Sequence, residues 1–169
     1  VRALDRLNTL ETALPGQYYT SFYKGLMFSA LYDFEPALQE FNTALDREPA
    51  ELNRVDILSH MAACQKDLEQ YDRAIATCEQ GLKIDKQGPD LYNTMGFCRF
   101  VKKQYKKAIS CFEQALEIDP SLAINYANIG SNYRELGDTK LAVHYYKMAL
   151  KIDPSIDFAR QNIEKLEKK

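Results

Sequence analysis

A repeat of 34 residues constrains the fold more than any other feature of this sequence. Residues between 89 and 122 recur in similar form between 123 and 156, and the two copies close with the nearly identical segments ALEIDPS and ALKIDPS. A fixed period of this length is typical of repeat architectures, in which each unit buries its apolar face against its neighbours. The matched pairs are Tyr92 and Tyr126, Met95 and Ile129, Gly96 and Gly130, Ala108 and Ala142, Phe112 and Tyr146, Ala115 and Ala149, and Pro120 and Pro154.

Each copy has the pattern of two helices joined by a short turn. Apolar residues recur at helical spacing on both sides of a polar break, which lies at 102–104 in one copy and 135–138 in the other. Asp138 is expected to cap the second helix of its copy, because its carboxylate can accept from an amide of the first turn. Pro120 and Pro154 are expected to stop the second helices.

Small residues predict close packing of the two helices within a copy. Each copy has a glycine in its first helix and an alanine in its second, as at Gly130 and Ala142. If the glycine faces the alanine, the two backbones can approach closely, and Tyr146, or Phe112 in the other copy, fills the space beside them.

In these residues the chain resembles the tetratricopeptide repeat family. The small residue, the two alanines, the aromatic residue between them and the final proline stand at the family's intervals in both copies. The resemblance implies an all-α fold, a right-handed α-solenoid of helix-turn-helix repeats with flanking N- and C-terminal helices. It implies little about function, because the family uses one scaffold for many partners.

Four whole repeats are expected. The first has Phe41 at the aromatic position, and three extra residues, 52–54, separate it from the second and should lengthen a helix or a turn. In the second repeat Cys78 takes the aromatic position and Lys86 replaces the proline, so that Gly88 serves as the helix breaker. The repeats are predicted at 18–51, 55–88, 89–122 and 123–156.

Both ends of the chain are expected to be helical. Residues 1–17 carry leucines at helical spacing, and this segment is either the second helix of a preceding repeat or a dedicated capping helix. Because the chain opens at Val1 without a methionine, we expect an excised or processed fragment. Residues 157–169 are predicted to form a C-terminal capping helix, with Glu164 at the glycine position and a charged, solubilising end.

The sequence gives no sign of catalysis. It contains no glycine-rich phosphate loop, no nucleophile motif and no carboxylate pair at a glycine-flanked turn. Asp56, His60 and Cys64 share one helical face, but no further zinc ligand is evident nearby, which favours chance spacing over a metal site. We therefore expect no enzymatic activity, no cofactor and no metal.

Charge and cysteine content bear on the partners and the compartment. The net charge of -2 gives no reason to expect nucleic acid or an anionic membrane as the main partner. No apolar run approaches membrane-spanning length, so we expect no membrane insertion. The four cysteines form no close pair and lie in predicted helices, which favours free, buried thiols in a reducing compartment. With no visible secretory signal, a cytoplasmic protein is expected.

The resemblance implies a binding site on the concave face, which the first helices of the repeats form. One subclass of the family grips a C-terminal carboxylate there with lysine, asparagine and arginine, but the matching positions here have no lysine or arginine, so this clamp is disfavoured. What remains is a groove lined mainly by apolar residues, Val101 among them, with a few polar side chains that could hydrogen-bond to a bound backbone. The predicted peptide-binding residues are Tyr19, Phe22, Tyr23, Leu26, Asn93, Phe97, Phe100, Ile124, Asn128 and Ser131.

Two groups of side chains have a second interpretation. Tyr19 and Phe22 can be core residues packed against the N-terminal helix instead of binding residues. The lysines at 102, 103, 106 and 107 around Tyr105 are expected to form a solvated turn, although they can also contact an acidic partner.

The predicted function is a non-enzymatic scaffold for protein–protein interaction. Exposed aromatic patches usually mark a partner, and here the partner would be a hydrophobic or amphipathic segment of another protein held in the groove. A chaperone-like role is a subcase of this interpretation. Two alternatives stay open, a homo-oligomeric assembly module that self-associates through the aromatic end, and a regulatory domain of a larger enzyme.

Overall fold

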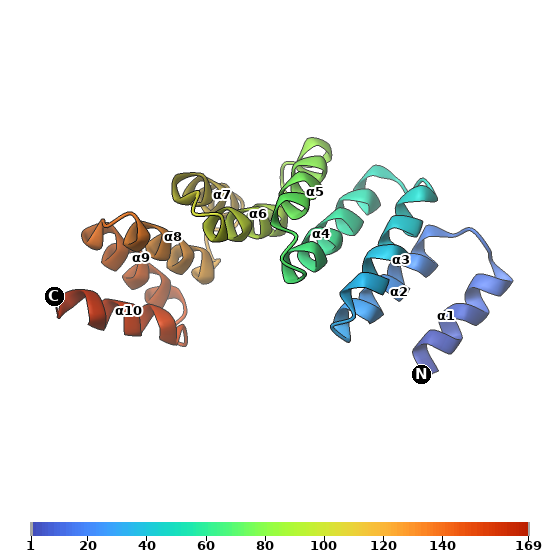
Figure 1. Ribbon diagram of the computed structural model, residues 1–169, viewed down its shortest axis with the longest axis horizontal. Helices are drawn as coiled ribbons and strands as arrows, with labels where there is room; N and C mark the ends of the chain where they lie inside the picture. Colours follow the sequence, from blue (N-terminus) through green and yellow to red (C-terminus); the bar gives the residue numbers. More distant parts are fainter. Residues whose placement is uncertain (1, 169) are drawn as a thin grey trace. The chain divides into compact units, whose positions relative to one another are not determined.

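The computed structural model describes residues 2–168, and their side chains from residue 4 onwards. Over this range the chain is all-α, with ten helices and no strand, as the sequence predicts (Figure 1). It divides into two compact units, Val1–Lys86 and Gln87–Lys169. The helices are α1 (Arg2–Ala13), α2 (Tyr18–Ala30), α3 (Phe34–Asp46), α4 (Glu51–Asp67), α5 (Tyr71–Ile84), α6 (Pro89–Val101), α7 (Tyr105–Ile118), α8 (Ala123–Glu135), α9 (Thr139–Ile152) and α10 (Asp157–Glu167).

The first unit is built from the helix pairs α2–α3 and α4–α5, with α1 beside α2. One core lies where α3 meets α4, and Phe22 and Leu26 of α2 pack against it. Burial of this apolar surface is the main stabilising contribution, because each helix presents one apolar stripe. The buried core residues are Ala37, Phe41, Ala44, Ile57, Leu58, Met61 and Cys64.

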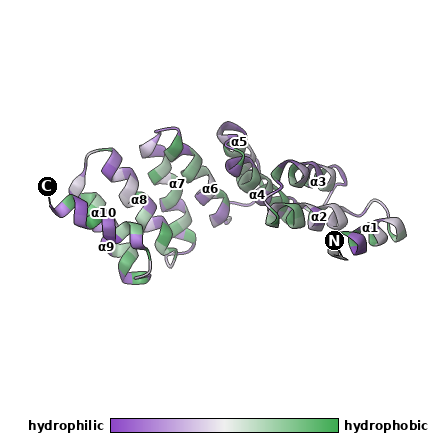
Figure 2. Cartoon of the chain, turned by 60° about the horizontal axis from the view of Figure 1, so that its bottom comes forward, coloured by the Kyte–Doolittle hydropathy of each residue, from purple (hydrophilic) through white to green (hydrophobic). Residues whose placement is uncertain are grey.

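The second unit repeats this arrangement with the pairs α6–α7 and α8–α9, and α10 packs on α9. Figure 2 shows hydrophobic and hydrophilic residues alternating along α9 and α10, as expected of helices with one covered face. Glu164 is exposed on α10, while Ile163 and Leu166 pack against the core that α8 and α9 form. No helix in the described range is both long and apolar enough to span a bilayer.

The turns lie where the polar breaks predict them. α6 ends at Val101 and α7 begins at Tyr105, and α8 and α9 are separated by 136–138. The predicted cap is confirmed, because Asp138 Oδ1 accepts a hydrogen bond of 3.0 Å from the Leu141 amide. Gly137 precedes it with φ of 82°, a left-handed conformation that glycine adopts without strain.

The IDPS segments end the second helices of both C-terminal repeats. Asp119 Oδ1 accepts from the Ser121 amide at 2.9 Å and from its hydroxyl at 2.6 Å. Asp153 makes the same two bonds with Ser155, at 2.8 and 2.7 Å. Hydrogen bonding to the ionised carboxylate lowers the pKa of both aspartates. In each segment the aspartate side chain therefore stabilises the turn after the helix, by bonding to the serine on the far side of the proline.

Each repeat glycine in a first helix lies against an aromatic ring. A Cβ atom added to Gly96 would stand 2.8 Å from Cε1 of Phe112, and one added to Gly130 would stand 2.9 Å from Cδ1 of Tyr146. The expectation that glycine faces alanine is only partly met, because the carbonyl oxygen of Ala142 lies 3.1 Å from that second position. The missing side chain of each glycine therefore makes room mainly for the aromatic ring of the second helix, and less for the backbone of that helix.

The second repeat departs from the pattern as the sequence predicts. The extra residues 52–54 lie within α4, which is lengthened to 17 residues. Cys78 is fully buried at the aromatic position, opposite which this repeat has Ala62 instead of glycine. Gly88 stands at the N-cap of α6 and separates it from α5.

Candidate peptide-binding site

The ten predicted binding residues fall into two groups. Tyr19, Phe22, Tyr23 and Leu26 lie on α2 of the first unit. The other six lie in the second unit, with Asn93, Phe97 and Phe100 on α6 and Ile124, Asn128 and Ser131 on α8. Each group is therefore a separate candidate, built on the first helices of repeats.

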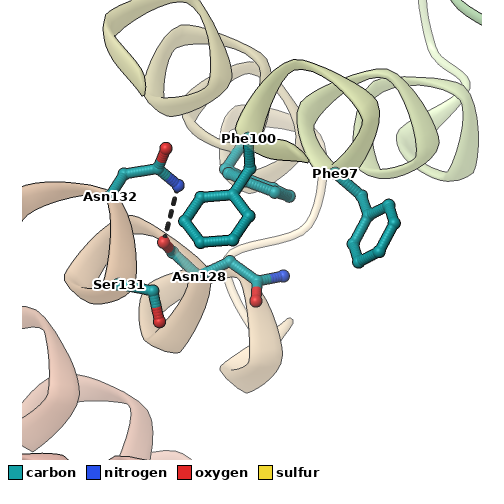
Figure 3. Close-up of a pocket in the computed structure, with 6 residues that line it drawn as sticks. Phe97, Phe100, Asn128, Ser131 and Asn132 are labelled. Carbon is teal, nitrogen blue, oxygen red and sulfur yellow. Dashed lines mark hydrogen bonds between the residues drawn. The ribbon is translucent and has the colours of Figure 1, made fainter. Parts of the chain in front are cut away.

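A cavity of about 80 Å³ lies between α6 and α8 (Figure 3). We call it the α6–α8 pocket. Four of the predicted residues line it, whereas Asn93 and Ile124 do not. Its lining residues are Phe97, Phe100, Phe112, Asn128, Ser131 and Asn132.

The two phenylalanines of α6 differ in burial. Phe97 is 43% exposed, and Val101 of α6 and Ile124 of α8, which do not line the pocket, are 38% and 45% exposed. Phe100 is half-buried, packs against the core of Ala108 and its neighbours, and has its ring centroid 5.8 Å from that of Tyr105. Phe97 thus presents part of its ring to solvent, while Phe100 forms both core and pocket wall.

Asn132 is a pocket residue that the sequence analysis missed. Its side chain is fully buried, its Nδ2 donates to the backbone oxygen of Asn128 at 2.8 Å, and its Oδ1 has no hydrogen-bond partner in the described chain. The preceding repeat has Cys98 at this position, 34 residues earlier. A polar residue at an apolar repeat position was the signal that could have identified it.

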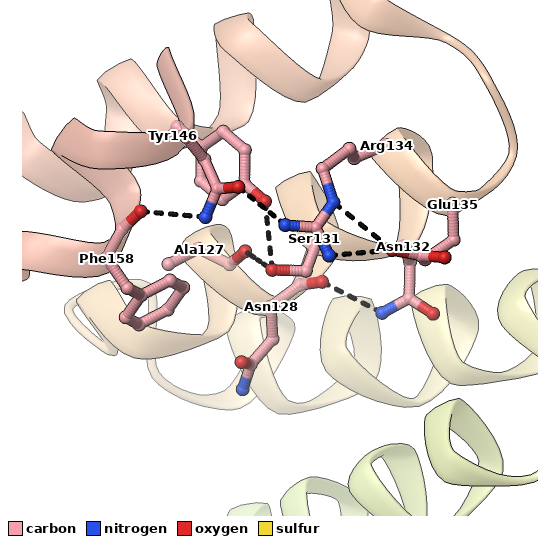
Figure 4. A network of polar contacts seen from close by, with 9 residues as sticks. Ala127, Asn128, Ser131, Asn132, Arg134, Glu135, Tyr146 and Phe158 are labelled. Atoms are coloured by element: carbon pink, nitrogen blue, oxygen red, sulfur yellow. Dashed lines mark hydrogen bonds and ion pairs between the residues drawn. The ribbon is translucent and has the colours of Figure 1, made fainter. Parts of the chain in front are cut away.

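Ser131 is held in place by its neighbours (Figure 4). Its hydroxyl donates to the Ala127 carbonyl at 3.1 Å and lies 3.0 Å from the phenol oxygen of Tyr146, which is fully buried. Burial raises the pKa of Tyr146, so the phenol stays protonated and can donate to Ser131. Only one lone pair of the serine oxygen is left for a ligand.

Asn93 is tied to the next repeat. Its Oδ1 accepts from Asn125 Nδ2 at 2.6 Å, which joins α6 to α8 beside the pocket. Asn125 is fully buried and stands where the preceding repeat has Leu91. Asn93 therefore has a structural role, which is to hold α6 against α8, besides its predicted role of bonding to a bound backbone.

The α2 group lies partly in the core. The ring centroid of Phe22 is 6.0 Å from that of Phe41 on α3, 5.7 Å from that of His60 on α4 and 5.7 Å from that of Tyr23 on its own helix. Leu26 packs against the same core. Tyr23 is 54% exposed and lines a cavity of about 180 Å³ together with Tyr18, Tyr19, Phe22, Asn53 and Asp56.

The histidine and cysteine of α4 pack into the protein. The His60 ring stacks on Phe41 with an interplanar angle of 19°. The Cys64 thiol donates to Ser29 Oγ at 3.5 Å, and burial raises its pKa. All four cysteines are buried, as predicted, and none of them is part of a disulfide in the described chain. Among the described residues no group of three or more histidine, cysteine or acidic residues could hold a metal.

Family comparison identifies the repeats. One tetratricopeptide repeat model matches residues 55–87 and a second matches 89–155, which together make up more than half of the chain. The chain is a tetratricopeptide repeat protein. No curated protein sequence matches it significantly.

Solved structures share this tetratricopeptide fold. YrrB, described as a TPR protein with an unusual peptide-binding site, is 18% identical with a TM-score of 0.81, over 96% of this chain and 82% of its own. MamA from Desulfovibrio magneticus RS-1 is 19% identical with a TM-score of 0.82, over 92% and 86%. The first TPR of Spaghetti (RPAP3), bound to the HSP90 peptide SRMEEVD, is 21% identical with a TM-score of 0.66, over 69% and 92%.

Proposed function

We propose that this tetratricopeptide repeat protein is a non-enzymatic interaction scaffold that holds a hydrophobic or amphipathic segment of another protein on its α6–α8 face. The observation that carries the proposal is the exposure of Phe97, 43%, at the edge of an apolar pocket. Exposed aromatic residues beside a preformed cavity typically mark a binding site. Peptide binding by YrrB and by the Spaghetti domain supports this use of the fold.

The pocket suits an aliphatic side chain of the partner. Its volume of about 80 Å³ is roughly half that of a 150 Å³ cavity that takes a benzene ring. Phe97 and Ile124 can cover the backbone beside such an anchor. The side-chain amide of Asn128 faces the pocket and can bond to a bound backbone, which would fix its register (Figure 3).

The charge of the pocket argues against a carboxylate anchor. None of its lining residues is lysine or arginine, whereas a buried carboxylate needs charge-assisted donors. Apolar contact therefore supplies the affinity, and the asparagine supplies hydrogen bonds.

Affinity capture with and without Phe97 tests the proposal. Proteins retained by the immobilised 169-residue chain are identified, and a labelled peptide from the retained protein is titrated against Phe97→Ala. We expect at least a tenfold loss of affinity, because a central aromatic anchor typically contributes more than 1.4 kcal/mol, about tenfold.

A matched variant controls for nonspecific apolar contact. Ile152→Ala removes a side chain that is 44% exposed at the end of α9 and lines neither the α6–α8 pocket nor the cavity beside Tyr23. It should bind like the wild type. Equal affinities of Phe97→Ala and wild type, with helicity preserved in both, would remove the α6–α8 face from the proposed function.

A further inference from the structure

A second, larger cavity in the C-terminal unit shares no residue with the α6–α8 pocket. Its volume of about 450 Å³ falls within the range of ligand sites in proteins. We call it the acidic groove. It is lined by Glu113, Leu116 and Glu117 of α7, Tyr126 and Ile129 of α8, and His144, Tyr145 and Met148 of α9.

The two glutamates of the groove have no cationic partner among the residues whose side chains the structure describes. Glu113 and Glu117 are one helical turn apart on α7, a spacing at which like charges repel and destabilise a helix. Neither forms an ion pair within residues 4–168, and Glu117 accepts a hydrogen bond of 2.9 Å from the neutral amide of Gln114. Both carboxylates are exposed, and no lysine or arginine of residues 4–168 neutralises their charge.

The neighbouring repeats do not carry this pair. Moving 34 residues in either direction replaces at least one carboxylate by a lysine, so the double negative charge is particular to α7 and is no requirement of the repeat. The equivalent residues are Glu79 and Lys83 on α5 and Lys147 and Lys151 on α9.

An ordered aromatic ring faces the same space. The ring of Tyr145 is stacked on Tyr133, with centroids 5.4 Å apart and an angle of 16°, and it meets His144 edge to face. Burial raises the pKa of Tyr145, and the nearby Tyr133 and Glu113 raise it further. Because these contacts already hold the Tyr145 ring in place, little conformational entropy is lost when a planar cation stacks on it.

We propose that the acidic groove binds an arginine side chain of a partner protein. A guanidinium can pair with the carboxylates of Glu113 and Glu117 while its plane stacks on the Tyr145 ring. Leu116, Ile129 and Met148 line the groove with apolar surface for the aliphatic stem and for a neighbouring aliphatic residue. Arginine is favoured over lysine because the guanidinium is planar and more weakly hydrated than an ammonium. This interaction goes beyond the proposed function and does not depend on Phe97.

Titration with three capped peptides tests the chemistry. The ¹⁵N-labelled 169-residue chain is titrated with acetyl-Ala-Leu-Arg-Leu-Ala-amide and with the same peptide carrying lysine or glutamine in place of arginine. We expect the arginine peptide to shift the amide signals of Leu116, Glu117 and Tyr145 and to bind at least tenfold more tightly than the glutamine peptide. The lysine peptide should bind more weakly than the arginine peptide, and salt should weaken both.

Single charge removals locate the site. Glu113→Gln should weaken the arginine peptide at least tenfold, whereas Glu164→Gln, an equal charge change at an exposed position of α10, should not. Phe97→Ala should leave this binding unchanged, which separates it from the α6–α8 face. Equal affinity for arginine and glutamine peptides, equal affinity for arginine and lysine peptides, or shifts confined to α6 and α8, would overturn the proposal.

Discussion

At the scale of single residues, glycine and aromatic ring form a matched pair in three of the four predicted repeats. The pairs are Gly25 with Phe41, Gly96 with Phe112 and Gly130 with Tyr146. The remaining repeat has Ala62 and Cys78 at the same two positions. A larger residue on the first helix thus accompanies a smaller one on the second, so that the space between the helices stays filled.

Gly96→Ala should destabilise the protein. The new Cβ would lie 2.8 Å from the Phe112 ring, which is 2% exposed and enclosed by core. Alanine gains about 1 kcal/mol of helix propensity over glycine, but overpacking a filled core costs about 1–3 kcal/mol, so the contact should win. Urea unfolding should show a net loss of about 1 kcal/mol, and of no more than about 2 kcal/mol.

The same substitution in a Phe112→Cys background is the matched control. There the alanine should be neutral or stabilising, since Ala62 and Cys78 already coexist in the second repeat. A double-mutant cycle should therefore give a favourable coupling between the two changes. Additive effects would contradict the pairing.

A second prediction at this scale concerns Asp153 and pH. Hydrogen bonds from the Ser155 hydroxyl and amide hold the pKa of Asp153 below its ordinary value. A lowered folded-state pKa stabilises the protein above the unfolded pKa, which is about 3.9, and this stabilisation is lost as the pH falls through the folded value. Ser155→Ala should therefore be less stable than wild type at pH 7, with a difference that shrinks below pH 4.

Unfolding of both proteins at pH 7 and pH 3 measures this difference, and titration of the Asp153 carboxyl by NMR should show its pKa rising in the variant. A stability difference that is the same at both pH values would point to lost backbone order instead of the carboxylate.

At the scale of helices, one ion pair attaches α1 to the rest of the first unit. Arg47, just after α3, donates to Glu11 Oε1 at 2.8 Å, to Glu11 Oε2 at 3.2 Å and to the Gln17 carbonyl at 2.8 Å. The hydrogen bond from Arg47 is the largest cause of a lowered pKa of Glu11. The two side chains are 22% and 24% exposed, so screening by water limits the contribution of the pair.

Arg47→Gln should loosen α1. We expect a global loss of no more than about 1 kcal/mol, because the pair is partly solvated, but a clear rise in amide exchange of α1. Exchange in α4 should not change, since its core contacts do not involve Arg47. Lys83→Gln, an equal charge removal at an exposed position of α5, is a suitable control, and unaltered protection of α1 in Arg47→Gln would show that other contacts hold this helix.

At the scale of the whole molecule, each compact unit has a core of its own. The first contains the cluster around Phe41 and Ile57. The second contains one cluster around Phe112 and another around Tyr146, on which α10 packs. Repeat proteins derive their stability from such local units and the interfaces between neighbours.

A fragment of residues 87–169 should therefore fold alone. It retains both clusters and the C-terminal helix, so we expect a helical circular dichroism spectrum and a cooperative urea transition. Gly96→Ala should shift that transition to lower urea. A fragment without cooperative unfolding would show that its clusters are too small to stabilise it without the first unit.

The sequence alone determined the helices and their breaks. The period, the capping Asp138 and the IDPS segments act through neighbours within a few residues along the chain, and such local interactions can be recognised in a single sequence. The extension of α4 by the extra residues 52–54 followed in the same way.

Only the tertiary structure decided what each helix face meets. It placed Phe97 at the surface and Phe100 half in the core, joined Asn93 to Asn125, and set Glu113 and Glu117 beside the Tyr145 ring. These outcomes depend on contacts between residues distant in sequence, which a helical period does not specify because it gives the direction of a side chain but not its neighbour on the next helix.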